Sequence, residues 1–130
     1  MIRAFLAGFA LLVLTGMITA GCKTGKDNPF AEMRRDRPVP LRVDNNNFLD
    51  VSVFATSGGV RVRLGEVTGK DVGTFAIDPQ RLSMAAGLQI LVDPLGSGET
   101  FLSPVVFPTR SETVVLTVGA VLSQSYISLR

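Results

Sequence analysis

Residues 51–64 have the sequence VSVFATSGGVRVRL, and this stretch decides the fold class. Its apolar side chains alternate with others on both sides of a glycine pair; the alternating set is Val51, Val53, Ala55, Val60, Val62 and Leu64. Because side chains change face at each residue of a strand, Phe54, Arg61 and Arg63 fall together on the opposite face. A Gly-Gly pair between two such runs is typical of a tight β-hairpin. The stretch therefore predicts a half-buried antiparallel hairpin.

Similar short runs continue on both sides of this hairpin, at residues 41–43, 72–77, 88–92, 101–107, 114–118 and 121–129. Residues 78–87 predict one or two helical turns that cross between sheets. Asp78 suits the N-cap, Pro79 suits the first helical position, and Gly87 could end the segment. Pro104 lies inside residues 101–107 and indicates an edge strand or a bulge. Asp44-Asn45-Asn46-Asn47 predicts a turn.

These runs predict an all-β fold. Seven or eight short strands, with a turn about every ten residues, are typical of a small Ig-like antiparallel β-sandwich with one short helical crossover. The Cys–Trp–Cys pattern of antibody domains is absent, so the prediction concerns architecture and not membership of that family. A small barrel is the competing fold.

The composition excludes several kinds of chemistry. The chain has 130 residues, one Cys, no His and a formal charge of +2, and this length suits one domain. A single Cys rules out an intramolecular disulfide and a Cys-based zinc site. The commonest general base is missing with His, and the charge is too small for a nucleic-acid partner. We therefore predict no catalytic residues, no metal and no cofactor.

Residues 44–50 invite a calcium interpretation, because hard cations bind oxygen ligands. Asp44 and Asn46 fit the first and third positions of an EF-hand loop. Phe48, Leu49 and Ala55 occupy positions that require a ligand, a glycine and a glutamate, respectively. We interpret the segment as a tight polar turn, with a calcium site of another kind as the alternative.

The first 21 residues have the pattern of a secretory signal peptide. Arg3 is their only charge, an apolar stretch runs from Ala4 to Ile18, and the small residues Ala20 and Gly21 follow. The stretch is short for a membrane span, which needs about 20 apolar residues. Residues 1–21 are therefore predicted to be a cleaved leader.

The only cysteine, Cys22, comes directly after this leader. Thr19-Ala20-Gly21-Cys22 resembles the lipobox of bacterial lipoproteins, although Thr19 stands where the family usually has Leu. The resemblance implies diacylation of the Cys22 sulfur, cleavage between Gly21 and Cys22, and acylation of the new amino terminus. Lys23, in place of Asp, implies the outer membrane where a second membrane exists. The alternative is an uncleaved helix with a buried bystander thiol.

The segment that follows Cys22 is polar and contains Gly25 and Pro29, which predicts a flexible linker. The predicted organisation is a signal peptide (1–21), a lipidated cysteine with its tether (22–37) and a sandwich domain (38–130). The tether's basic residues could attract anionic head groups. Its interspersed acids favour a solvated spacer instead.

These features predict a lipid-anchored, extracytoplasmic, non-catalytic binding or assembly module of the cell envelope. Its expected partners are the membrane, through the N-terminal anchor, and an envelope protein. Arg61, Arg63 and Phe54 are the candidate partner-binding residues, although charged side chains on a strand face also keep a protein soluble. The alternatives are a small-ligand or glycan binder and, least favoured, a carboxylate- or metal-dependent enzyme.

Overall fold

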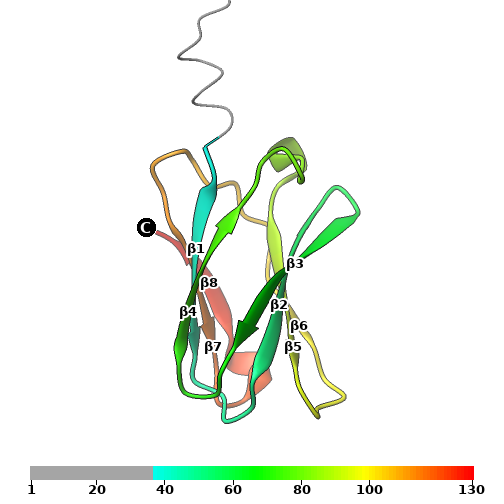
Figure 1. The fold of residues 1–130 in the computed structure, drawn as a ribbon, viewed down its shortest axis with the longest axis vertical. Helices are drawn as coiled ribbons and strands as arrows, with labels where there is room; N and C mark the ends of the chain where they lie inside the picture. The colour runs from blue at the N-terminus through cyan, green and yellow to red at the C-terminus, as the bar shows by residue number, and fades with distance from the viewer. Residues whose placement is uncertain (1–36) are drawn as a thin grey trace, which may run out of the picture.

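The computed structural model describes residues 37–130. The predicted signal peptide, the lipobox at Thr19–Cys22 and the tether up to residue 36 lie outside the described residues. Eight strands form two packed four-stranded sheets, which confirms the predicted small sandwich (Figure 1). The strands are β1 (Val39–Asn45), β2 (Val51–Ser57), β3 (Val60–Val67), β4 (Val72–Ile77), β5 (Gln89–Pro94), β6 (Phe101–Leu102), β7 (Val114–Val118) and β8 (Tyr126–Leu129). Each sheet keeps two edges, so the fold is not a barrel.

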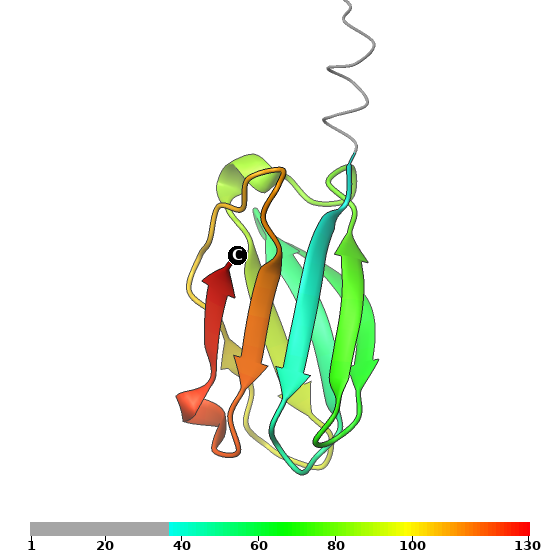
Figure 2. The same cartoon turned by 90° about the vertical axis from the view of Figure 1, so that its left-hand side faces the viewer.

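The strand orders are β4-β1-β7-β8 in one sheet and β3-β2-β5-β6 in the other. All pairs are antiparallel except β1 and β7, which run parallel from Leu41 opposite Val114 to Asn45 opposite Val118. The sheets are therefore mainly antiparallel, as predicted, with one parallel pair. Between β1 and β7 the chain builds the whole second sheet, and such a long excursion supplies the crossover that a parallel pair requires (Figure 2).

The core lies between the sheets and consists of aliphatic side chains from alternate strand positions. Val51, Val53 and Ala55 of β2 are fully buried, as the alternation predicts. Their predicted counterparts on β3 are less buried, and Val60 is exposed. β3 is an edge strand, and its pairing jumps at a bulge that leaves Leu64 without a partner on β2. A bulge bends its strand, which accounts for this weaker burial.

The crossover after β4 differs from the predicted helix. Its helical part is a single 3-10 turn (Met84–Ala86) with Ser83 at the N-cap, so the predicted start at Pro79 is wrong. The Asp78 carboxylate instead accepts the backbone N–H of Gln80 and closes a local turn. The predicted end at Gly87 is confirmed, and its φ of +81° is one that glycine adopts without strain.

The predicted strand at residues 101–107 is also corrected. Only Phe101–Leu102 is a strand, and Val106 forms an isolated bridge with Leu88. Pro104 has no N–H to continue the ladder. The buried Ser103 completes the pairing instead, because its N–H donates to the Ile90 carbonyl and its Oγ accepts the Ile90 N–H.

Between β7 and β8 lies a second 3-10 turn (Leu122–Gln124), so residues 121–129 contain one strand. Among residues 37–130, no helix has the length and apolar character that a bilayer span requires.

Candidate functional site

The two ends of the sandwich differ. The described chain enters at Arg37, just before β1, and we call this the entry end (Figure 2). The opposite, distal end carries four loops: residues 46–50, 68–71, 95–100 and 119–125. Loops clustered at one end of a rigid sandwich commonly form a binding site. The distal loops are therefore the first place to look for function.

A buried asparagine organises the distal end. Asn45, at the end of β1, is only 1% exposed. Its side-chain amide donates to the carbonyls of Leu49 (2.9 Å), Val67 (3.2 Å) and Thr68 (3.1 Å). Its Oδ1 accepts the backbone N–H of Asn47 (3.0 Å). One side chain thus fixes the loop at 46–50 against the hairpin between β3 and β4.

Asn47 and Asp50 fasten the same loop to its other neighbours. The Asn47 amide donates to the Ala120 carbonyl (3.2 Å), and the Asp50 carboxylate accepts the N–H of Gly69 (2.9 Å). The Asp50 carbonyl accepts the N–H of Leu95 (2.8 Å). The loop at 46–50 is therefore hydrogen-bonded to all three surrounding loops.

This hydrogen-bonded framework exposes apolar side chains. The four distal loops themselves carry four exposed large apolar residues, which we call the distal patch: Phe48, Leu49, Leu95 and Val121. Phe48 is 79% exposed, and the Lys70 ammonium lies 4.0 Å from the centre of its ring. A cation over an aromatic face stabilises that ring position. Grouped, exposed apolar residues on a fixed framework are typical of a protein-interaction site.

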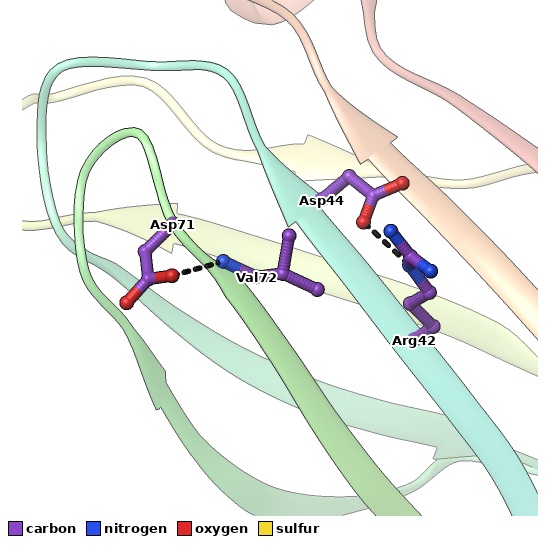
Figure 3. Close-up of polar contacts among 4 residues, drawn as sticks. All are labelled: Arg42, Asp44, Asp71 and Val72. Carbon is purple, nitrogen blue, oxygen red and sulfur yellow. Dashed lines mark hydrogen bonds and ion pairs between the residues drawn. The ribbon is translucent and has the colours of Figure 1, made fainter.

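Several side-chain oxygens in and beside residues 44–50 already accept hydrogen bonds. The Asp44 carboxylate accepts the Arg42 guanidinium at 2.7 Å, and the Asp71 carboxylate accepts the N–H of Val72 (Figure 3). The side-chain oxygens of Asn45 and Asn47 accept backbone N–H groups. Within residues 37–130 no three metal-ligating side chains converge. Asp44 and Asn45 belong to β1, so the predicted turn at Asp44–Asn47 is corrected to a connection at residues 46–50.

The structure brings together the three residues proposed for partner binding. Phe54 lies opposite Arg63 on the outer face of β2 and β3, and the Arg61 guanidinium carbon is 5.8 Å from the Phe54 ring centre. Arg63 pairs with Glu66 at 2.5 Å. Phe54 is only half-buried, with Arg61 over it, and Arg63 already has an acidic partner. This patch offers a partner less free apolar surface than the distal patch does.

Sequence reasoning missed Phe48 and Leu49 as candidate binding residues. Both residues served there only as evidence against a calcium loop. The signal that was passed over is the presence of two large apolar residues inside a polar segment. Leu95 and Val121 join them only through the tertiary fold.

Comparison with protein-family models gave no match, and comparison with curated proteins gave none. Among solved structures, an NMR structure of a protein from Eubacterium rectale is similar, with a TM-score of 0.46 and 13% identity. The similarity covers 72% of this chain and 88% of that one.

Gly69 supplies a test of the distal framework. A Cβ at this position would lie 2.1 Å from the Phe48 carbonyl oxygen. Gly69→Ala should therefore displace the loop and lower the free energy of unfolding by about 1–3 kcal/mol, the usual range for overpacking. Chemical denaturation measures the loss. Gly98→Ala is the control, because a Cβ there meets nothing within 4 Å. Equal stability of the two variants would contradict the close approach.

Proposed function

We propose that the protein is a lipid-anchored, extracytoplasmic, non-catalytic binding or assembly module of the cell envelope. Acyl chains on Cys22 hold it to a membrane, residues 23–37 act as the tether, and the sandwich presents the distal patch to an envelope protein. The observation that carries the proposal is an exposed, preorganised apolar patch at the end opposite chain entry.

The distal loops suit binding because little conformational freedom remains to be lost. Ordering flexible loops on association costs about 0.5–1.5 kcal/mol for each immobilised side chain. Here Asn45, Asn47 and Asp50 already hold the loop at 46–50 in place. An exposed aromatic ring at the centre of such a patch is a typical binding hot spot. The matching partner has an apolar pocket for Phe48.

Strand addition at either edge of the β3-β2-β5-β6 sheet is a less suitable mode of binding. β6 has two residues and is soon followed by Pro104, so it offers a partner almost no continuous ladder. β3 is longer, but its bulge at Leu64 disturbs the line of backbone donors and acceptors. Short, bulged and proline-interrupted edges resist pairing with another strand. These edges support loop-mediated binding.

Detergent extraction of the tagged full chain with its partner tests the proposal. Phe48→Ala should weaken recovery of the partner by about 30-fold or more, because loss of a hot-spot side chain costs about 2 kcal/mol or more. Phe107→Ala is the matched control, since Phe107 is an exposed aromatic at the entry end. Recovery that is unchanged by Phe48→Ala, or reduced equally by both substitutions, would contradict a distal binding site.

A further inference from the structure

We propose that the entry end of the sandwich is a docking surface for anionic lipid head groups, so that the distal patch points away from the bilayer. From the proposed function, this inference takes only the membrane anchor. It is carried by the distribution of charge, by a hollow between two arginines and by an exposed aromatic ring beside them.

Charge is divided along the long axis of the sandwich. Residues 37–130 contain eight basic and eight acidic side chains. The charges within two ion pairs, Arg42–Asp44 and Arg63–Glu66, cancel and are left out of the count. The remaining charges at the entry end are Arg37, Arg61, Arg81, Arg110 and Arg130 with Asp78 and Glu112; those at the distal end are Lys70 with Asp50, Asp71, Asp93 and Glu99. Among side chains alone, five cations against two anions give +3, and one against four gives −3.

The topology places these arginines together. At the entry end, β1 and β7 begin, and β4 and β8 end. The residues next to these strand ends include four arginines that flank the same end of one sheet: Arg37, Arg81, Arg110 and Arg130. All four are exposed. Arg81 and Arg110 lie in separate loops, while Arg37 precedes β1 and Arg130 follows β8, so their charges add without a run of like charge in the sequence.

One of the two acids at this end is held by its own loop. Glu112 accepts the backbone N–H of Thr109 at 2.7 Å and closes the turn that carries Arg110. These hydrogen bonds from Thr109 lower the pKa of Glu112 below its ordinary value. The carboxylate therefore serves to shape the loop, and Arg110 projects from it as an exposed cation.

A hollow of about 230 Å³ opens at the same end. Its lining combines two arginines with proline and apolar side chains: Arg37, Pro38, Val39, Pro79, Met84, Pro108, Thr109 and Arg110. Guanidinium groups bind phosphate oxygens through paired, charge-assisted hydrogen bonds. Two of them beside an apolar floor match a lipid head group, in which a phosphate adjoins hydrocarbon.

An exposed aromatic ring adjoins this hollow in sequence. Phe107 precedes Pro108 and is 64% exposed. It lies over Gly87, where an added Cβ would be 3.0 Å from the ring. Aromatic and basic residues together are the usual composition of surfaces that bind at the bilayer interface. Phe107 is placed to contact the boundary between head groups and acyl chains.

The length of the tether brings this end to the membrane. The proposed tether comprises residues 23–37, and a flexible chain of this length would have a root-mean-square span of about 20 Å. The anchored sandwich therefore stays near the bilayer, where tethering raises its effective concentration at the surface. An anionic surface attracts the +3 end and repels the −3 end, which sets the orientation.

Vesicle flotation of unlipidated residues 23–130 tests the proposal independently of the anchor. All core residues of the sandwich lie between Val39 and Leu129, so this chain keeps the whole core. We expect binding to phosphatidylglycerol vesicles at low salt and far weaker binding to phosphatidylcholine vesicles. Each basic residue near an anionic surface contributes about a fivefold factor. The triple variant Arg37→Gln, Arg81→Gln, Arg110→Gln should therefore bind on the order of 100-fold more weakly.

The matched control removes three cations elsewhere, with Arg42→Gln, Arg63→Gln and Lys70→Gln, and so has the same net charge. It should bind within about threefold of the unsubstituted chain. Equal losses in the two triple variants, or equal binding to both lipids, would overturn the proposal. These results leave the anchor untouched, because acylation of Cys22 is measured separately in cells.

Orientation is read from single-cysteine labels, since residues 23–130 contain no cysteine. A fluorophore on Ser111→Cys, at the entry end, should be quenched by a quencher carried on the lipid head groups. A fluorophore on Ser123→Cys, at the distal end, should remain bright. Stronger quenching at position 123 than at 111 would refute the orientation.

Discussion

Replacing Cys22 by alanine should abolish fatty-acid incorporation and leave the leader of 21 residues attached. The resemblance to bacterial lipoproteins implies that the thiol is acylated before cleavage, so loss of the sulfur blocks both steps. The energetic consequence is large, because burial of each methylene contributes about 0.8 kcal/mol and two or more chains anchor a protein stably. Labelling cells with an alkyne fatty acid, followed by intact-mass measurement, reads both steps at once.

Two further variants sharpen this test. Thr24→Ala, two residues beyond the cysteine, should incorporate label and lose the leader as the natural chain does. Thr19→Leu restores the residue that lipoboxes usually carry and should speed processing. A natural chain with an unmodified Cys22 sulfur and an intact leader would contradict lipid anchoring.

Replacing Asn45 by leucine should cost about 3–5 kcal/mol in the free energy of unfolding. The side chain is buried, and its two amide protons serve the carbonyls of Leu49, Val67 and Thr68. Leucine has a similar volume but no donor, so these acceptors lose their partner. A buried polar group left without a partner costs about 1–3 kcal/mol. The Asn47 N–H also loses its acceptor.

Denaturation monitored by circular dichroism measures this loss, with Asn46→Ala as the control. Asn46 is exposed, and its removal should change stability by about 0.5 kcal/mol or less. Amide exchange in residues 68–71 should also accelerate in Asn45→Leu, because this hairpin loses the side-chain hydrogen bonds that supplement its backbone bond from Asn45 to Asp71. Similar stabilities for the two variants would show that the amide does not hold the distal loops.

Strand alternation and turn residues were sufficient to predict the sandwich. The hairpin around Gly58 and Gly59 is the clearest case, since both glycines adopt positive φ and join strands that alternate as expected. The bulge at Leu64 was missed, although Gly65 directly follows it with a positive φ and an isolated glycine inside a strand pattern indicates a bulge. The strand predicted at 101–107 ends where Pro104 has no N–H for the ladder, and the Ser103 hydroxyl accepts the Ile90 N–H there.

The distal patch and the charge division could not be predicted for a different reason. Both depend on residues that are far apart in the chain and meet only through the strand order. The loops that carry Phe48 and Val121 come together, since Asn47 donates a hydrogen bond to the carbonyl of Ala120. Arg37 and Arg130 share an end because β1 and β8 lie in one sheet. Periodicity within a segment contains no information about either.

The parallel pairing of β1 and β7 has a mechanical consequence. A pull on the tether enters the domain at Val39 and runs along β1, which lies between β4 and β7 and is hydrogen-bonded to both. Tension along a central strand loads the hydrogen bonds on both of its sides in shear, so they must break together and not in succession. A pull by a partner bound at the distal end would therefore be resisted by the hydrogen bonds on both sides of β1 at once.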